Sequence, residues 1–307
     1  MIDNAGNWET VVAPDGREIV TIGTPEFPAQ MWGPWQKASC ACTGVPWHWH
    51  EEMEMSLITE NTERMTVDGR TFDLQPGQGV FISGGVLHGS VPAPGYEHIN
   101  HISLVFHGSV VGGASGSIFW QKYLSPIAAA PECRCVPLLG ETAWERQALD
   151  ALQRMAGIWQ AQQPGYEFEM RAELSRIILL LKENCVRHAQ APSERELRDA
   201  ERIKQMVDFV RRHREEPITT EEIAASAAIS VSECLRCFRR MMDLTPKEYL
   251  RQHRIRHAVQ LLENTDKSIT RIGEECGFED MSYFARVFRV EKGCTPSEYR
   301  EKEKGGG

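Results

Sequence analysis

The last third of the chain repeats itself at a spacing of 50 residues, and this constrains the fold more than any other feature. Shifting segment 232–250 by 50 positions gives eight identities in nineteen residues, where chance would supply about one. The identical pairs are Ser232/Ser282, Arg236/Arg286, Phe238/Phe288, Arg239/Arg289, Thr245/Thr295, Pro246/Pro296, Glu248/Glu298 and Tyr249/Tyr299. The segment therefore holds two copies of one supersecondary unit.

Each copy has the pattern of a short helix, a tight turn and a longer helix. In the first, Thr219-Thr220-Glu221-Glu222 predicts the start of the short helix, and Ser230 or Ser232 caps the longer one. In the second, Gly277 suits the left-handed residue of the turn, and Asp280 or Ser282 is the cap. The longer helices are expected to bury Cys234, Cys237, Phe238 and Met241 in the first copy, and Tyr283, Phe284, Val287 and Phe288 in the second.

The opposite faces of the two longer helices carry the candidate DNA contacts. They present Ser232, Leu235, Arg236, Arg239 and Arg240 in the first copy, and Met281, Ser282, Ala285, Arg286 and Arg289 in the second. This is the arrangement of a helix-turn-helix unit, whose second helix enters the major groove. The alternative is a generic helical bundle with solvated arginines. A helix predicted from Thr245-Pro246 to Asn264 would span roughly 30 Å, near the roughly 34 Å between adjacent major grooves on one face of DNA.

The same segment resembles the AraC family of transcription regulators over residues 203–300. The residues that carry the resemblance are Arg254-Ile255, Ala258, Leu261-Leu262, Ile269, Ile272-Gly273, Gly277-Phe278, Ser282-Tyr283-Phe284, Arg286, Phe288-Arg289, Gly293, Thr295-Pro296 and Glu298-Tyr299-Arg300. The resemblance implies that Ser232, Leu235, Arg236, Met281, Ser282, Ala285 and Arg286 read bases, and that Arg239 and Arg289 lie near phosphates. Two positions depart from the family pattern: Asp243 stands where a Gly is usual, and Gly273 where an Ala is usual.

The net charge of −9 does not exclude DNA as a partner. Residues 1–198 hold 14 Lys+Arg and 23 Asp+Glu, whereas residues 199–307 hold 20 of each, so the whole excess lies outside the repeat. A neutral domain binds DNA when its cations gather on one face. The nine cysteines show no disulfide framework, and Cys234-x-x-Cys237 has no second pair at zinc-finger spacing, so reduced thiols packed in a core are expected.

No long apolar run and no signal-peptide pattern is present, which favours a cytoplasmic protein with no membrane partner.

Residues 45–110 have the alternating pattern of short strands broken by Gly and Pro. Strands are predicted at 55–58, 64–67, 70–74, 80–82 and 102–106, with a hairpin turn at Asp68-Gly69. Many short strands at even spacing predict an all-β sandwich or small barrel. Two helices follow, at about 141–162 and 167–187, which could pack on the barrel or pair across a dimer.

Within these strands, His48, His50 and Glu54 share strand parity and so point to one face. With His88 they resemble the two motifs of the cupin family, which in metal-binding members supply three His and one Glu to a metal. Three interpretations remain: an effector pocket without metal, which we favour, a pocket loaded with a divalent transition metal, and a structural hydrogen-bond cluster. Trp47 and Trp49 flank the histidines and are candidates either to contact an effector or to form core.

The sequence thus predicts a multidomain protein. An all-β cupin-like effector barrel (1–125) precedes a helical packing or dimerisation segment (126–189), a linker (190–196) and an all-α double helix-turn-helix domain (197–302). The predicted function is a transcription regulator, acting as an activator or a repressor, that requires no cofactor. Its expected partners are promoter DNA, a small effector such as a sugar, a second copy of the chain and RNA polymerase. The alternative is a metal-dependent cupin enzyme or metal sensor tethered to DNA-binding helices.

Overall fold

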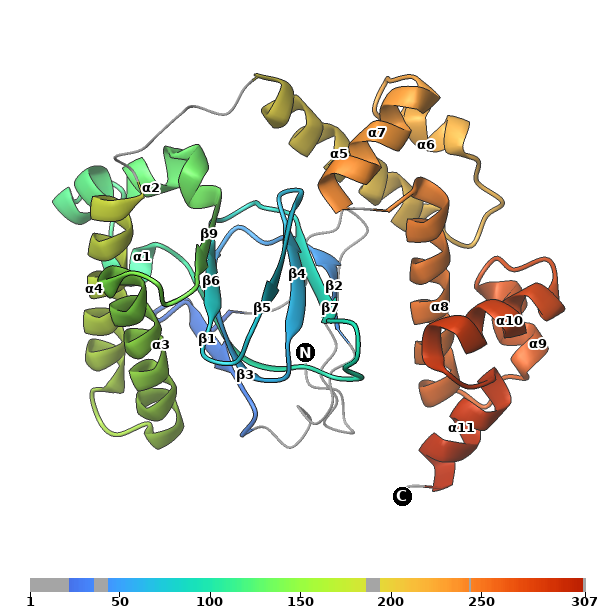
Figure 1. Ribbon diagram of the computed structural model, residues 1–307, viewed down its shortest axis with the longest axis horizontal. Helices are drawn as coiled ribbons and strands as arrows, with labels where there is room; N and C mark the ends of the chain where they lie inside the picture. The colour runs from blue at the N-terminus through green and yellow to red at the C-terminus, as the bar shows by residue number, and fades with distance from the viewer. Residues whose placement is uncertain (1–21, 36–43, 186–193, 243, 306–307) are drawn as a thin grey trace. The chain divides into compact units, whose positions relative to one another are not determined.

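The computed structural model describes residues 22–35, 44–185, 194–242 and 244–305, which fall into two compact units, 1–200 and 201–307 (Figure 1). Cys40, Cys42, Asp243 and residues 190–193 of the predicted linker lie outside the described residues. Within the described part of the chain, no helix is long and apolar enough to cross a membrane.

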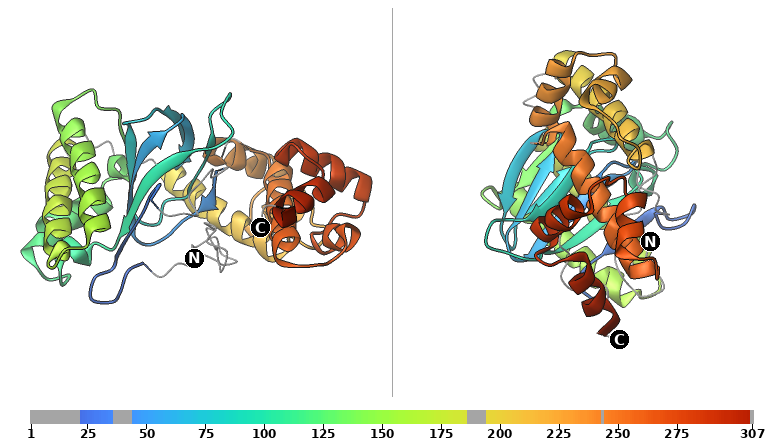
Figure 2. Two further views of the ribbon diagram at one scale, coloured as in Figure 1. Left: turned by 90° about the horizontal axis from the view of Figure 1, so that it is seen from below. Right: turned by 90° about the vertical axis from the view of Figure 1, so that its right-hand side faces the viewer.

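The first unit is built on two antiparallel sheets that face each other (Figures 1 and 2). The five-stranded sheet has the order β1 (Ala29–Trp32), β8 (Asn100–Phe106), β3 (Met53–Glu60), β6 (Gly79–Ile82), β9 (Cys135–Leu138). The four-stranded sheet has the order β2 (Val45–His48), β7 (His88–Pro92), β4 (Glu63–Val67), β5 (Arg70–Leu74). The five predicted strands are confirmed as β3, β4, β5, β6 and β8. Asp68 and Gly69 form the predicted hairpin turn, with φ of 50° and 78°.

Strand β3 shows how this unit separates its core from its polar interior. Met53, Met55 and Leu57 belong to a buried cluster that also holds the apolar stripes of α3 (Ala143–Ala161) and α4 (Tyr166–Asn184). The intervening residues Glu54 and Ser56 point to the opposite side, because successive side chains on a strand alternate. Both predicted long helices are therefore present, and their apolar stripes pack on the sheet. Shorter helical segments connect β8 to β9: α1 (Ser109–Gly112), a π-helical turn (Trp120–Leu124), α2 (Ser125–Ala129) and a 3₁₀ turn (Pro131–Arg134).

The second unit follows the predicted repeat. Helix α5 (Glu194–Arg212) precedes the first copy, α6 (Thr220–Ser226) and α7 (Val231–Met242). The rod α8 (Pro246–Asn264) leads to the second copy, α9 (Ile269–Glu275) and α10 (Met281–Lys292), and α11 (Pro296–Gly305) ends the described chain. Thr219 and Thr245 each form a full capping box. Of the alternative caps, Ser230 accepts a hydrogen bond from the backbone N–H of Glu233, and Asp280 caps α10.

The apolar sides of α7 and α10 agree with the prediction at seven of the eight positions. Cys234, Cys237, Phe238 and Met241 are buried, as are Phe284, Val287 and Phe288. The prediction that Tyr283 lies on the inner side is wrong, because its side chain is 41% exposed. Its ring lies at the edge of the apolar stripe, against Phe278 on one side and Arg286 on the other.

Candidate effector site and nucleic-acid interface

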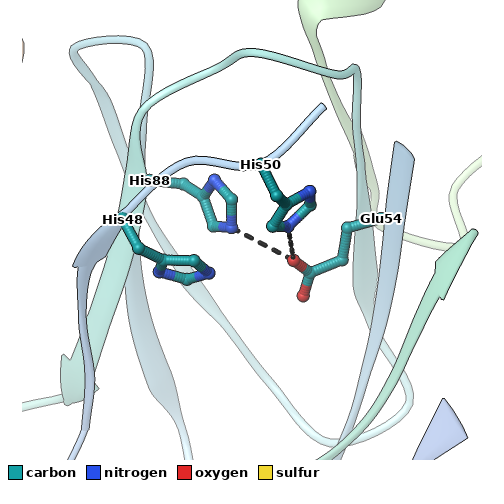
Figure 3. Close-up of side chains that lie close together, drawn as sticks. All are labelled: His48, His50, Glu54 and His88. Atoms are coloured by element: carbon teal, nitrogen blue, oxygen red, sulfur yellow. Dashed lines mark hydrogen bonds and ion pairs between the residues drawn. The ribbon is translucent and has the colours of Figure 1, made fainter. Parts of the chain in front are cut away.

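His48, His50, Glu54 and His88 meet between the two sheets (Figure 3). Their ligand-type atoms lie within 4.8 Å of one another, and all four side chains are buried. Glu54 is on β3 of one sheet, whereas His48 and His88 come from paired strands of the other. Glu54 Oε2 lies 3.1 Å from the Nε2 atoms of both His50 and His88. The convergence expected from the two motifs is therefore present.

The three imidazoles share one hydrogen-bonding arrangement. The Nδ1 atoms of His48, His50 and His88 lie 2.8, 2.9 and 2.8 Å from backbone carbonyl oxygens. A carbonyl oxygen only accepts, so each Nδ1 carries a proton and donates it. In a neutral imidazole, Nε2 then presents a lone pair to the centre of the cluster. Because a carboxylate also only accepts, the contacts to Glu54 require an added proton on the imidazoles or a cation among these atoms.

Burial and mutual repulsion set the charge balance of the cluster. Burial, together with the nearby His88 and His50, holds the pKa of His48 well below its ordinary value. Burial opposes ionisation of Glu54, but hydrogen bonds from His50 and His88 and their charges hold its pKa well below the ordinary range. Ser56 and Ser103 each donate a hydrogen bond of 2.9 Å to the other carboxylate oxygen, Oε1. Glu54 is therefore an ionised acceptor fixed from both sides.

The cluster borders a cavity of about 420 Å³, measured with its opening to solvent. Besides His48, Glu54 and His88, the cavity is lined by Trp32, Val45, Ser56, Met65, Gly89, Ser90, His101, Ser103 and Val105. Sequence reasoning missed these residues because they lie on six strands and form no local motif. The structure places Trp32 at the cavity, whereas Trp47 and Trp49 do not line it. They occupy alternate positions to His48 and His50 and so point to the other side of the strand.

A second polar pair joins the two sheets beside the cavity. Glu63 on β4 is fully buried, and its Oε2 lies 2.9 Å from Nδ1 of His101 on β8. Burial lowers the pKa of His101, but the charge of Glu63 and the hydrogen bond to it, helped by Glu54, leave that pKa above its ordinary value. Glu63 Oε1 and the hydroxyl of Ser90 are buried without a hydrogen-bond partner among the described residues.

The candidate DNA-reading side chains lie on the exposed sides of α7 and α10. On α7, the exposed candidates are Ser232, Leu235, Arg236 and Arg239, and Arg240 is half-buried. On α10, the exposed candidates are Ser282, Arg286 and Arg289, and the half-buried ones are Met281 and Ala285. Met281 is partly withdrawn because its sulfur packs over Gly273, where a Cβ atom would lie 2.6 Å from it. The unusual Gly at 273 thus makes room for the Met at 281.

Two family models match the chain. The model described as an AraC-like ligand binding domain matches residues 42–182, and the one described as a helix-turn-helix domain matches residues 223–302. The chain belongs to the AraC family. It is a DNA-binding transcription regulator with an N-terminal ligand-binding domain.

Relatives in this family match most of the chain. The uncharacterized HTH-type transcriptional regulator YdeC of Bacillus subtilis is 28% identical over 84% of this chain and 86% of its own length. The HTH-type transcriptional activator RhaS of Klebsiella pneumoniae is 24% identical over 84% of this chain and 88% of its own. A solved AraC-type transcriptional regulator from Chromobacterium violaceum is 31% identical, covers 35% of this chain and 96% of that one, and has a TM-score of 0.33.

Proposed function

We propose that this AraC-family regulator changes transcription when a small polar effector occupies the cavity between its two sheets. The observation that supports this is the buried hydroxyl of Ser90, which lines the cavity and has no hydrogen-bond partner among the described residues. Leaving such a group unsatisfied costs about 1–3 kcal/mol, so an effector that forms a hydrogen bond with Ser90 would recover that free energy on binding. His101, which is paired with Glu63, lines the same cavity and offers a second polar group. Trp32, Met65 and Val105 supply the apolar walls that such pockets usually have.

Melting temperature tests the effector site directly. The full chain is screened against a panel of neutral polyols, amino compounds and carboxylates, and compounds that raise the melting temperature are retested on Ser90→Ala and Glu63→Gln. We expect both variants to lose most of the shift. Glu97→Gln, an exposed carboxylate on the same unit, is the matched control and should keep it. Compounds that shift all four proteins equally would place the effector elsewhere.

On the DNA side, we propose that Ser232, Leu235, Arg236, Met281, Ser282, Ala285 and Arg286 face base edges, while Arg239, Arg240 and Arg289 face phosphates. Arg286→Ala, and to a lesser degree Arg236→Ala, should weaken specific binding by about 1–3 kcal/mol, because each removes a bidentate base contact. Arg239→Ala and Arg289→Ala should weaken binding to all sequences and flatten its salt dependence. Unchanged specific affinity in all four variants, measured by gel shift at fixed salt, would exclude this interface.

A divalent transition metal at the histidine cluster is a second candidate, favoured by the shared Nδ1 arrangement. Metal-bound imidazoles usually donate their other N–H to a carbonyl or carboxylate, as all three do here. His48, His50, Glu54 and His88 would hold the ion, whose charge would keep Glu54 ionised and offer an electrophilic position to an effector oxygen. Elemental analysis should then find about one equivalent of metal, absent after joint replacement of His48 and His50 by Ala. If the protein contains no metal and its melting temperature is unchanged by a chelator, the metal site is excluded and the effector pocket without metal remains.

We also propose that the protein acts as a homodimer, contacts RNA polymerase and has no enzymatic turnover of its own. The known relatives are transcriptional regulators, which supports the last point. An enzyme tethered to DNA-binding helices would instead convert a compound found in the screen. Mass spectrometry of that compound after incubation with the protein separates the two cases.

A further inference from the structure

The two reading arginines have different neighbours one helical turn earlier. The 50-residue shift that pairs Arg236 with Arg286 also pairs Glu233 with Tyr283. On a helix, residues three apart lie side by side, so each of these residues sits next to its arginine. One copy of the unit therefore places a carboxylate beside its reading arginine, and the other places an aromatic ring there.

In the first unit, the neighbouring residue occupies the arginine. Glu233 forms an ion pair with Arg236 through Oε2, and its Oε1 lies 4.0 Å from Nη1 of Arg202 on α5. The ion pair uses Nη2 of Arg236, one of the guanidinium nitrogens that a bidentate contact to guanine O6 and N7 would also use. The carboxylate also places a negative charge on the face that meets phosphates. Glu233 and a base therefore compete for Nη2 of Arg236.

In the second unit, the neighbouring residue is aromatic, and the guanidinium of the arginine lies over its ring. Arg286 Cζ lies 5.4 Å from the centroid of the Tyr283 ring, and the described ion pairs include none with Arg286. A ring that stacks on the guanidinium face restricts its position but leaves its in-plane N–H donors free.

The Tyr283 ring is itself supported from inside the domain. Its centroid lies 6.3 Å from the centroid of the Phe278 ring. Arg254 in turn lies over the Phe278 ring, with Cζ 5.8 Å from the ring centroid. Arg254 is fixed by donating hydrogen bonds to the backbone oxygens of Arg214 and Glu216, at 2.7 and 2.6 Å. Arg254, Phe278, Tyr283 and Arg286 thus form a continuous series from α8 to the exposed side of α10.

We propose that the residue three positions before each reading arginine decides how much that unit contributes to base reading, with Tyr283 positioning Arg286 and Glu233 withholding Arg236. This rests on the proposed role of the two arginines in base contact. Tyr283 is a positioning residue, since it acts through Arg286. The second unit accordingly provides most of the sequence discrimination, and the first unit provides less until its ion pair opens.

The test uses the full chain and the duplex that it selects from a randomised DNA library, with a scrambled duplex for comparison. Tyr283→Leu keeps apolar bulk but has no aromatic face, and we expect about 5- to 10-fold weaker specific binding, between the cost of a lost cation–π contact at an exposed site and that at a desolvated one. Tyr283→Phe keeps the ring and should bind within about twofold of the unaltered protein. In a double-mutant cycle, Tyr283→Leu should add little once Arg286 is Ala, because its effect passes through that residue.

In the first unit, Glu233→Gln should strengthen specific binding several-fold, and Arg236→Ala should cost more in that background than alone. Far-ultraviolet circular dichroism and the melting temperature confirm that each variant is folded. Additive effects of Tyr283→Leu and Arg286→Ala, or a Tyr283→Phe variant as weak as Tyr283→Leu, would overturn the positioning role. Unchanged binding in Glu233→Gln would overturn the withholding role. If Arg286→Ala alone has no effect, the base contact itself fails, and this inference fails with it.

Discussion

Ala228 adopts a backbone conformation that L-residues rarely take. It lies in the turn between α6 and α7 with a φ of 53°, and its side chain is exposed. In the second copy the left-handed turn residue is Gly277, with a φ of 78°. Without a Cβ atom, glycine takes this conformation at no steric cost, whereas other residues pay about 1–2 kcal/mol. The first turn therefore carries strain that the second avoids.

Ala228→Gly should raise the free energy of unfolding by about 0.5–1 kcal/mol, since relief of strain exceeds the added entropy of the unfolded chain. Urea denaturation measures this change. Ala225→Gly is the matched control, because Ala225 is an exposed residue inside α6. That variant should lose about 1 kcal/mol. Equal changes in the two variants would show that the turn at Ala228 is unstrained.

Also at the residue scale, replacing His48 and His50 together with Ala should abolish the response of DNA binding to an effector found by the melting screen. The cluster lies inside the first unit, whereas the reading helices belong to the second, so affinity for DNA without effector should stay within a few fold. Fluorescence anisotropy with and without the compound measures both quantities. A full response in the double variant would remove these histidines from effector sensing.

At the scale of elements, the turn between α9 and α10 fixes the second helix-turn-helix unit. A Cβ atom on Gly277 would lie 2.8 and 2.9 Å from the backbone oxygens of Arg214 and Glu215. The turn and the segment after α5 therefore pack too closely for any side chain. Since the opposing atoms are backbone, no rotamer change relieves the contact.

Gly277→Ala should lower the free energy of unfolding by more than about 2 kcal/mol, because it adds a backbone clash to the strain of a left-handed alanine. Gly293→Ala provides the control: Gly293 has a φ of 72° but no atoms within 4 Å of the added Cβ. It should show only the strain, about 1 kcal/mol. Thermal unfolding followed by circular dichroism compares them, and similar losses in both would exclude the close approach as the cause.

At the scale of the whole molecule, residues 197–307 should bind the same DNA as the full chain, but more weakly. The second unit has its own buried clusters, including the one formed by α8, α9 and α10. A full-length dimer would add a second DNA-binding unit and so raise the effective concentration. Gel shift with both proteins on the selected duplex measures the difference. Binding by residues 1–190 alone would contradict this division of roles.

The sequence by itself determined the second unit almost completely. Its helices, caps and exposed arginines follow from local rules, namely helical periodicity, capping boxes and the presence of two copies of the same unit. Ala228 and Tyr283 escaped those rules. The left-handed turn at Ala228 is imposed by the helices on both sides, and Tyr283 sits at the boundary of the apolar stripe, where only neighbouring rings decide its exposure.

In the first unit, the sequence placed His48, His50, Glu54 and His88 because strand parity and motif spacing are local. Only the tertiary structure decided what surrounds them. Ser90, His101 and Trp32 reach the cavity from strands distant in sequence, and Trp47 and Trp49 turn away from it. The sequence also did not determine what α3 and α4 pack against, because an apolar stripe predicts that one face of a helix is buried but does not identify the surface that covers it. Strand pairing and helix docking are long-range choices, and no periodicity within one segment records them.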